Sequence, residues 1–285
     1  MILKRKVLHP KNVKKLIIIS GQQRSGKSTL SKIISSFEGP INNRIDFFLD
    51  SLLSLKRINN ITNKVFQEIF KIYLNNLIID SHYGRNFNLK KNEESSIWSS
   101  TNPKHYLNII KKKFTRKEIK KSLIKNSEMV LVLHNFLEFL NIFPKEQYQL
   151  KIINIKSHPV DQIYSMYKSK TNFKFDNLSR EIIYIYKNRK YCVSVDIEDK
   201  FNRLNLMQKI LLIKKNQDLK EIKNINLSKK NYKYLNVHYE ELIRNPKKIV
   251  NLIAKFLDKK KTSFTNNLIK QNIKKRLFLD PIERE

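Results

Sequence analysis

The segment GQQRSGKST, at residues 21–29, limits the folds open to this chain more than any other stretch. It follows KLIIIS (15–20), a β-branched apolar run typical of a buried strand, and precedes TLSKIISSF, whose apolar spacing predicts a helix. The string fits G-x-x-x-x-G-K-[ST], in which glycines let backbone N–H groups wrap a phosphate at the positive end of a helix. The sequence therefore predicts a phosphate-binding loop (P-loop) between a strand and a helix.

Three further apolar runs predict strands, at residues 129–133 (MVLVL), 150–155 (LKIINI) and 234–238 (YLNVH). Helical patterns follow them, and such alternation indicates a mostly parallel sheet. We therefore expect a P-loop-containing α/β fold of three layers, with a central mostly parallel sheet flanked by helices. Residues 47–80 are predicted to be largely helical, residues 81–103 irregular, and residues 173–231 helical and very polar.

The length of 285 residues suits one large α/β domain or two small ones. Because no Pro or Gly linker marks a second domain, we expect a single P-loop domain over residues 1–285, with its core at 15–258 and a helical and loop insertion at 40–125. The lone Cys192 excludes a disulfide within the chain and a cysteine-based zinc site. No apolar run reaches the roughly 20 residues of a membrane-spanning helix, so we expect an untargeted, cytoplasmic protein.

The formal net charge of +33, from 58 Lys and Arg against 25 Asp and Glu, would attract anionic partners. The basic residues occur in short clusters along the whole chain, without a recognisable nucleic-acid-binding motif. We therefore expect no specific nucleic-acid partner. An overall bias toward Lys, Asn and Ile would explain the charge without any partner.

Three segments, in order along the chain, resemble the sulfotransferases that use 3′-phosphoadenosine 5′-phosphosulfate (PAPS). The first is the loop itself, since Arg24-Ser25-Gly26 followed by Lys27-Ser28 looks like the family's 5′-phosphosulfate loop. The second, LKIINIKSHPVDQIYSMY (150–167), resembles the strand, Arg-Asp/Asn-Pro-x-Asp, helix and Ser pattern that holds the 3′-phosphate. The third, VHYEELIRNPKKIVNLIAKFL (237–257), is similar to the family's strand-end Tyr-Glu-Asp/Glu-Leu, followed by Asn/Asp-Pro and an amphipathic helix.

The chain departs from the family's pattern at three places. Lys27 replaces the usual Thr or Ser, and Ser157 stands where the family has Arg, so either Lys156 takes over the 3′-phosphate or the donor is bound differently. The C-terminal Arg-Lys-Gly loop of cytosolic members is absent, although residues 274–276 (KKR) could supply charge.

The resemblance implies an enzyme that transfers a sulfuryl group from PAPS to a hydroxyl acceptor, leaves PAP as product and requires no metal. It implies that Arg24 and Lys27 are catalytic, acting on the 5′-phosphosulfate and its bridging oxygen. His134 would be the general base, because LVLHNFLEFLNIFP looks like the family's strand, Thr-His and downstream Pro, here Pro144. The donor-binding residues that it implies are Gly21, Gln22, Gln23, Arg24, Ser25, Gly26, Lys27, Ser28, Thr29, Lys156, Ser157 and Ser165.

The acceptor region is expected in the insertion at 40–125. Tyr83, Arg85, Asn86 and Trp98 could stack on and hydrogen-bond a sugar, which favours a glycan or glycolipid acceptor, although they would also suit a phenol or a small alcohol. Glu93 and Glu94 are alternative candidates for the base.

Two other functions stay open from the residues alone. A P-loop kinase or NTPase would use Lys27 with Ser28 on Mg²⁺, and Asp80 is the one tempting second metal ligand. Alternatively, a basic polyanion-binding protein could keep the fold after losing donor binding, which the change at Ser157 allows.

Overall fold

A computed structural model of the chain describes residues 12–39, 43–91, 93, 96–100, 102–125, 127–143, 148–169, 182–192, 201, 203–228 and 232–272. Within these residues a five-stranded parallel sheet has the strand order β2-β3-β1-β4-β7. The strands are β1 (Lys15–Gly21), β2 (Asn43–Ile45), β3 (Glu128–His134), β4 (Gln149–Lys156) and β7 (Lys233–His238). The four strands predicted from apolar runs are therefore confirmed.

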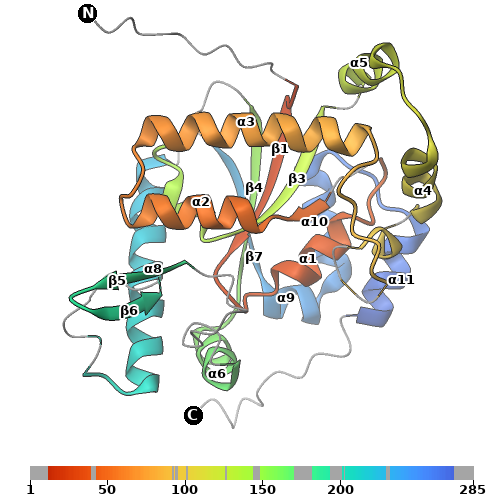
Figure 1. Cartoon of the computed structure of the whole chain (residues 1–285). Coiled ribbons are helices and arrows are strands. Elements are labelled where there is room, and N and C mark those ends of the chain that lie inside the picture. The colour runs from red at the N-terminus through yellow and green to blue at the C-terminus, as the bar shows by residue number, and fades with distance from the viewer. Residues whose placement is uncertain are drawn as a thin grey trace, which may run out of the picture.

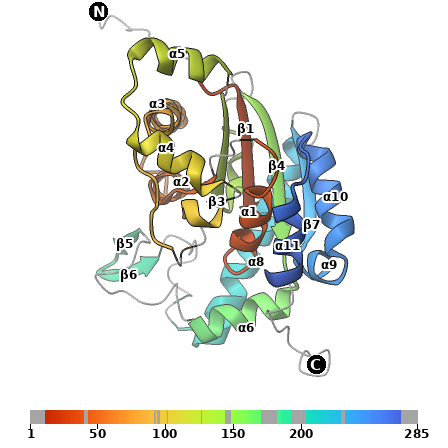
Figure 2. The same ribbon diagram turned by 90° about the vertical axis from the view of Figure 1, so that its right-hand side faces the viewer.

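Helices cover both faces of the sheet, as Figures 1 and 2 show from two directions. Strand side chains alternate between two cores: Leu16 and Ile18 of β1 pack on one face, and Ile17 and Ile19 on the other. The first core is covered by α2 (Phe47–Arg57) and α3 (Asn63–His82). The second is covered by α1 (Lys27–Ile34), α9 (Tyr239–Arg244), α10 (Pro246–Leu257) and α11 (Ser263–Asn272). This arrangement confirms the three-layer α/β fold.

Further helices surround these cores, and two of them also contribute buried residues to the first core. They are α4 (Pro103–Lys111), α5 (Arg116–Lys125), α6 (Pro159–Ser169), the long α8 (Leu206–Ser228) and the 3₁₀ helices η1 (Ile97–Ser99) and η2 (Phe136–Phe139). A third hydrophobic cluster, which includes Met166 of α6 with Ile210 and Ile213 of α8, packs the first half of α8 against α6. That packing places one side of α8 beside the end of β4.

The prediction of a helical segment over residues 173–231 is wrong in part. Among its described residues, α8 is helical, but β5 (Ile183–Tyr186) and β6 (Arg189–Cys192) form an antiparallel hairpin. Lys187 and Asn188 connect them with φ angles of 47° and 59°, the left-handed pair that a two-residue hairpin turn requires. The aromatic and β-branched run IYIY favours a strand despite the polar surroundings.

The register of the parallel sheet brings distant residues to one edge. Gly21 at the end of β1 pairs with His134 at the end of β3, and Lys156 at the end of β4 pairs with His238 at the end of β7. Because parallel strands end at the same edge, the P-loop, His134 and Lys156 share the carboxyl edge of the sheet. Ligands of open α/β sheets bind at this edge.

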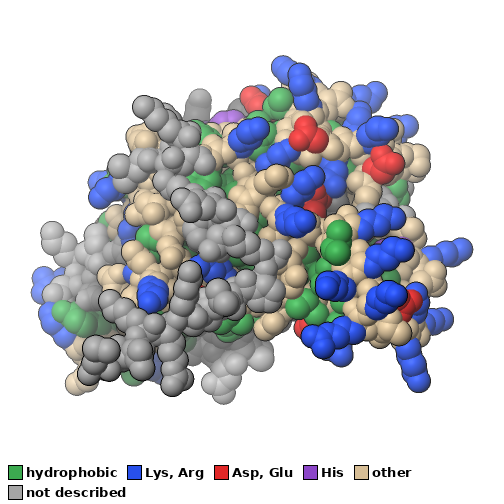
Figure 3. Space-filling view, turned by 90° about the horizontal axis from the view of Figure 1, so that it is seen from above, with side chains coloured by type: hydrophobic (Ala, Val, Ile, Leu, Met, Phe, Trp, Pro, Cys, Tyr) green, Lys and Arg blue, Asp and Glu red, His purple; other side chains and the backbone are tan. Residues whose placement is uncertain are grey.

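Basic side chains are numerous on the described surface (Figure 3). In the view from above, Lys and Arg side chains crowd one side of the described surface with few Asp and Glu among them (Figure 3). Residues 103–125, which form α4 and α5, carry nine Lys and Arg and one acidic residue, Glu118. Of the helices that the structure describes, none has the length and hydrophobicity to cross a bilayer.

Candidate functional site

The P-loop is held in a shape that depends on left-handed backbone angles. Arg24 and Gly26 have φ angles of 61° and 95°. A Cβ atom on Gly26 would lie 2.4 Å from Cδ2 of Tyr239, so only glycine fits beneath that ring. From α6, the Gln162 side-chain amide donates a hydrogen bond to the Gln23 carbonyl at 2.6 Å. The loop is therefore braced by two elements that follow β4 and β7.

Lys27 is buried at the start of α1, with 6% of its surface exposed. Its Nζ donates a hydrogen bond to the carbonyl of Gln22 at 2.7 Å. Burial lowers the pKa of Lys27 from 10.5 to about 7, and the negative charge of Asp50 opposes that fall. The side chain therefore changes between charged and neutral forms near neutral pH, and an anion bound in the loop would favour the charged form.

His134 is held by a carboxylate from another element. Asp50, on α2, accepts a hydrogen bond from the His134 backbone N–H at 2.9 Å and from its Nδ1 at 2.7 Å. The two contacts fix both the position and the ring orientation of His134, and they leave Nε2 as the nitrogen that can accept a proton. The His134 side chain is 38% exposed, so a substrate can reach it.

A cavity of about 400 Å³ lies between the loop, the end of β4 and α8. Four of the predicted donor-binding residues, Gln22, Ser25, Lys156 and Ser157, contribute to its wall. The other lining residues are Ile155, His158, Pro159, Gln162, Lys214, Asp218, Glu221, Ile222, His238 and Glu240. The structure thus brings the first and second sequence segments together at one cavity.

Two buried hydroxyl groups in the cavity wall fit a ligand that carries phosphate. Among the described residues, neither Ser25 Oγ nor Ser157 Oγ has a hydrogen-bond partner. A buried polar atom without a partner is costly, and a phosphate oxygen would satisfy both hydroxyls as an acceptor. These residues therefore fit the phosphate groups of the implied donor.

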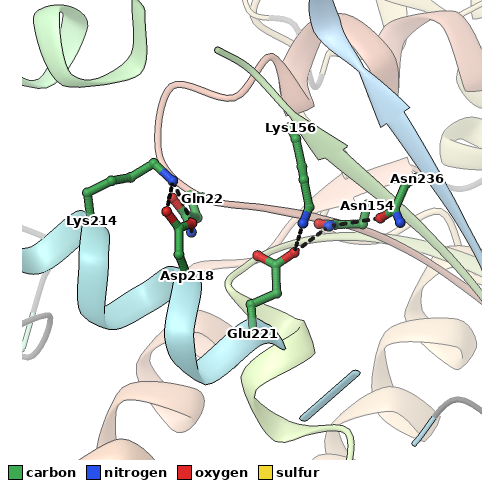
Figure 4. Close-up of polar contacts among 7 residues, drawn as sticks. All are labelled: Gln22, Asn154, Lys156, Lys214, Asp218, Glu221 and Asn236. Atoms are coloured by element: carbon green, nitrogen blue, oxygen red, sulfur yellow. Dashed lines mark hydrogen bonds and ion pairs between the residues drawn. The ribbon is translucent and has the colours of Figure 1, made fainter. Parts of the chain in front are cut away.

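The far wall of the cavity is a polar face of α8 (Figure 4). Lys214 Nζ contacts both carboxylate oxygens of Asp218, at 2.5 and 2.6 Å, and the Gln22 side-chain amide donates to the same carboxylate at 2.7 Å. One turn further along, Glu221 contacts Lys156 Nζ at 2.7 Å. The α8 face is thus joined by hydrogen bonds and ion pairs to both predicted phosphate-binding segments.

The cavity wall contains none of the other predicted site residues, which are Gly21, Gln23, Arg24, Gly26, Lys27, Ser28, Thr29, His134 and Ser165. Arg24 is exposed, Ser28 and Thr29 are half-buried in the first turn of α1, and Ser165 is half-buried on α6. None of these four is among the residues that line the cavity. Their roles toward the donor stay predictions.

The predicted acceptor residues make contacts within their own segment. The Arg85 guanidinium lies 4.8 Å from the centre of the Tyr83 ring, and Asn86 donates to Asp80 at 2.9 Å. The Trp98 indole N–H donates to the carbonyl of Leu89, also at 2.9 Å. Asp80 lies near the end of α3 and is paired with Arg85 at 3.6 Å, a setting typical of a helix end.

Of the two glutamates that are alternative candidates for the base, the structure describes one, Glu93. Glu93 pairs with Lys90 at 3.3 Å and accepts a hydrogen bond from Asn88, so it is engaged within its own loop. Glu94 lies outside the described residues, as do Pro144 and residues 274–276. Within the described part of the chain, no group of three or more His, Cys, Asp or Glu side chains could hold a metal ion.

Sequence reasoning missed five residues of the site. Asp50 gives no local signal, because its contact with His134 joins positions 84 residues apart. Gln162 is not one of the positions of the family's pattern, so the resemblance gives it no role. The polar residues of α8 do carry a signal, since Lys214, Asp218 and Glu221 follow the i, i+4, i+7 spacing of one helix face.

Comparison with known proteins identifies the family of the chain. A family model described as "Sulfotransferase domain" matches residues 14–280. A comparison with curated proteins gives no match. Among solved structures, the chain is similar to a sulfotransferase domain from the curacin biosynthetic pathway, with 12% identity, a TM-score of 0.42, and coverage of 95% of this chain and 82% of that chain.

Two further solved structures are similar to the chain. The first is a sulfotransferase domain from the Synechococcus PCC 7002 olefin synthase, with 14% identity, a TM-score of 0.40, and coverage of 98% of this chain and 90% of that one. The second is a retinol dehydratase in complex with androsterone and inactive cofactor PAP, with 12% identity and a TM-score of 0.38. The match covers 94% of this chain and 65% of that one.

Proposed function

The chain belongs to the sulfotransferase domain family and is a PAPS-dependent enzyme, and we propose that its P-loop and the end of β4 hold the donor. Residues 21–29 would bind the 5′-phosphosulfate, and Lys156, Ser157 and Ser165 would bind the 3′-phosphate. The observation that carries this proposal is the cavity, whose wall contains both segments and two buried hydroxyls that have no partner among the described residues.

We propose that Arg24 and Lys27 stabilise the charge that grows on the leaving phosphate. When bound, PAPS supplies the sulfuryl group, which moves to an acceptor oxygen. Lys27 is suited to this role because its ammonium is desolvated, and a charge in a site of low dielectric acts more strongly than one in water. Backbone N–H groups of the loop and the first turn of α1 add fixed dipoles directed at the same anion.

We propose that His134 is the general base for the acceptor hydroxyl and that Asp50 is its positioning residue. His134 stands beside Gly21 in the sheet, so the base is next to the loop that would hold the donor. The Asp50 carboxylate would accept a hydrogen bond from Nδ1–H and stabilise the imidazolium that forms when Nε2 takes the hydroxyl proton.

We propose that the acceptor is a hydroxyl of a glycan or glycolipid. Phe47 and Phe48, in the first turn of α2, are 45% and 47% exposed. Phe47 is one helical turn before Asp50 and therefore lies on the same side of α2 as the residue that positions the base. An exposed ring at that place is suited to stacking on the apolar face of a sugar.

The test combines donor binding with an acceptor screen. Calorimetric titration with PAP and, separately, with ATP·Mg²⁺ should give micromolar binding of PAP without metal, and much weaker binding of ATP·Mg²⁺. Preference for ATP·Mg²⁺ would refute the donor assignment. Transfer of ³⁵S from labelled PAPS is then measured to sugars, glycolipids, phenols and simple alcohols, and faster transfer to phenols than to any sugar would refute the acceptor assignment.

A further inference from the structure

Two ammonium groups, Lys156 and Lys214, are the lysines of the cavity wall, and they come from different elements. Lys156 ends β4, whereas Lys214 lies on α8 and is 8% exposed. Its side chain points toward the cavity and toward Gln22 of the P-loop (Figure 4). A lysine that is almost fully buried, at a cavity next to a phosphate-binding loop, is a candidate phosphate ligand in its own right.

Each lysine already shares a carboxylate oxygen with a neutral amide donor. Oδ1 of Asp218 receives Lys214 Nζ at 2.5 Å and Gln22 Nε2 at 2.7 Å. Oε1 of Glu221 receives Lys156 Nζ at 2.7 Å and Asn154 Nδ2 at 2.8 Å. An ammonium and an amide converging on one anionic oxygen is the donor set that a phosphate oxygen would also use. The two carboxylates thus use the ammonium and amide donors that a phosphate in this cavity would need.

The charges of the cavity wall make this arrangement unfavourable for a bound polyanion. Besides the two lysines, the wall contains the carboxylates of Asp218, Glu221 and Glu240. With all three carboxylates in place, a nucleotide that carries several negative charges would be repelled. The Asp218 side chain is 43% exposed and can turn toward solvent, whereas that of Glu221 is 9% exposed and is held more firmly.

We propose that Lys214 and Lys156 form a two-lysine phosphate site for the donor nucleotide, in which Asp218 and Glu221 occupy the phosphate positions until the donor displaces them. The inference rests on the proposed donor site and adds to it a ligand from α8. The two flexible ammonium groups together supply the charge that Ser157 cannot supply. Glu221 therefore competes with the phosphate of the donor, whereas Lys214 binds that phosphate.

The test is calorimetric titration with PAP, adenosine 3′-monophosphate and adenosine 5′-monophosphate at moderate salt. Lys214→Met should weaken PAP binding by about 10-fold to 100-fold, the usual value of a hydrogen bond to a charged group. Binding of adenosine 3′-monophosphate should weaken by the same factor, because Lys156 is assigned to the 3′-phosphate, while adenosine 5′-monophosphate should keep its affinity. The matched control is Lys215→Met, the exposed neighbour on α8, which should bind all three ligands as the unchanged protein does.

A second variant is expected to change the affinity for PAP in the opposite direction. Glu221→Gln removes the competing charge and keeps the size of the side chain, so it should tighten PAP binding several-fold. A purely structural role of α8 predicts weaker binding of every ligand in both variants. Lys214→Arg, which keeps the positive charge, should retain most of the affinity.

The outcomes separate this inference from the proposed function. If the unchanged protein binds none of the three nucleotides, the donor site itself is refuted, and this inference with it. If that protein binds PAP and Lys214→Met binds it equally well, the two-lysine site alone is refuted. Should Lys214→Met fail to fold, Glu221→Gln decides, because unchanged or weaker PAP binding in that variant overturns the proposal.

Discussion

Binding of PAP should be accompanied by proton uptake at Lys27. In the ligand-free protein the pKa of this side chain is about 7, so at pH 8 about nine molecules in ten carry it uncharged. A phosphate bound next to the ammonium raises the pKa, so each binding event at pH 8 should take up about 0.9 proton. The affinity for PAP should consequently fall by about tenfold for each pH unit above neutrality, until the pKa of the bound state is reached.

The assay is calorimetric titration of PAP at pH 8 in two buffers of different ionisation enthalpy, at equal ionic strength. The difference between the observed enthalpies gives the number of protons taken up. Lys27→Met is the control, because it removes the titrating group and leaves proton uptake by every other side chain in place. Equal proton uptake by Lys27→Met and the unchanged protein would refute the assignment of Lys27 to the donor.

The same burial has a consequence for stability that needs no ligand. A lysine with a folded-state pKa of about 7, against 10.5 for its ordinary value, destabilises the fold increasingly as the pH falls from 10.5 toward 7. At pH 7 this destabilisation lowers the free energy of unfolding by at most about 4 kcal/mol. Lys27→Met should therefore unfold at higher urea concentration than the unchanged protein at pH 7, and the gain should shrink at pH 10.

Three further predictions concern the base, the loop and α2. Asp50→Asn and His134→Ala should each lower turnover at saturating PAPS by roughly a hundredfold, and the double variant should fall little further; additive losses would contradict a shared role. Gly26→Ala should abolish PAP binding, because its Cβ would lie 2.4 Å from the Tyr239 ring, and normal affinity would contradict the rigid loop. Asp46→Ala, which removes the N-cap of α2, should cost about 2 kcal/mol in urea unfolding, and no loss would contradict the cap.

The parts of the site that follow from local sequence were predictable, and those that depend on tertiary contacts were not. The P-loop is a contiguous pattern, and His134 could be found because it directly follows an apolar strand. Asp50 and Asp218 reach the site across separations of 84 and 196 residues, for which a single sequence offers no spacing rule. The hairpin over 183–192 was missed because polar flanking residues masked its alternating aromatic run.

The acceptor region shows the same limit in another way. Residue types alone suggested that Tyr83, Arg85, Asn86 and Trp98 would stack on and hydrogen-bond a sugar. In the fold, however, the Trp98 indole is engaged with its own loop, and the Arg85 guanidinium is engaged at the end of α3. Aromatic and polar residues in an irregular segment can satisfy one another locally, so their composition does not predict where they point.

The bracing of the P-loop by Gln162 and Tyr239 also bears on how fast the donor can bind. The amide contact to the Gln23 carbonyl and the ring packed against Gly26 are made by protein groups alone. The loop therefore loses its conformational freedom during folding. Binding of PAPS then requires no further loss of conformational entropy from the loop. We expect association close to the rate set by diffusion and electrostatic attraction, with residence time determined by the contacts that break on release.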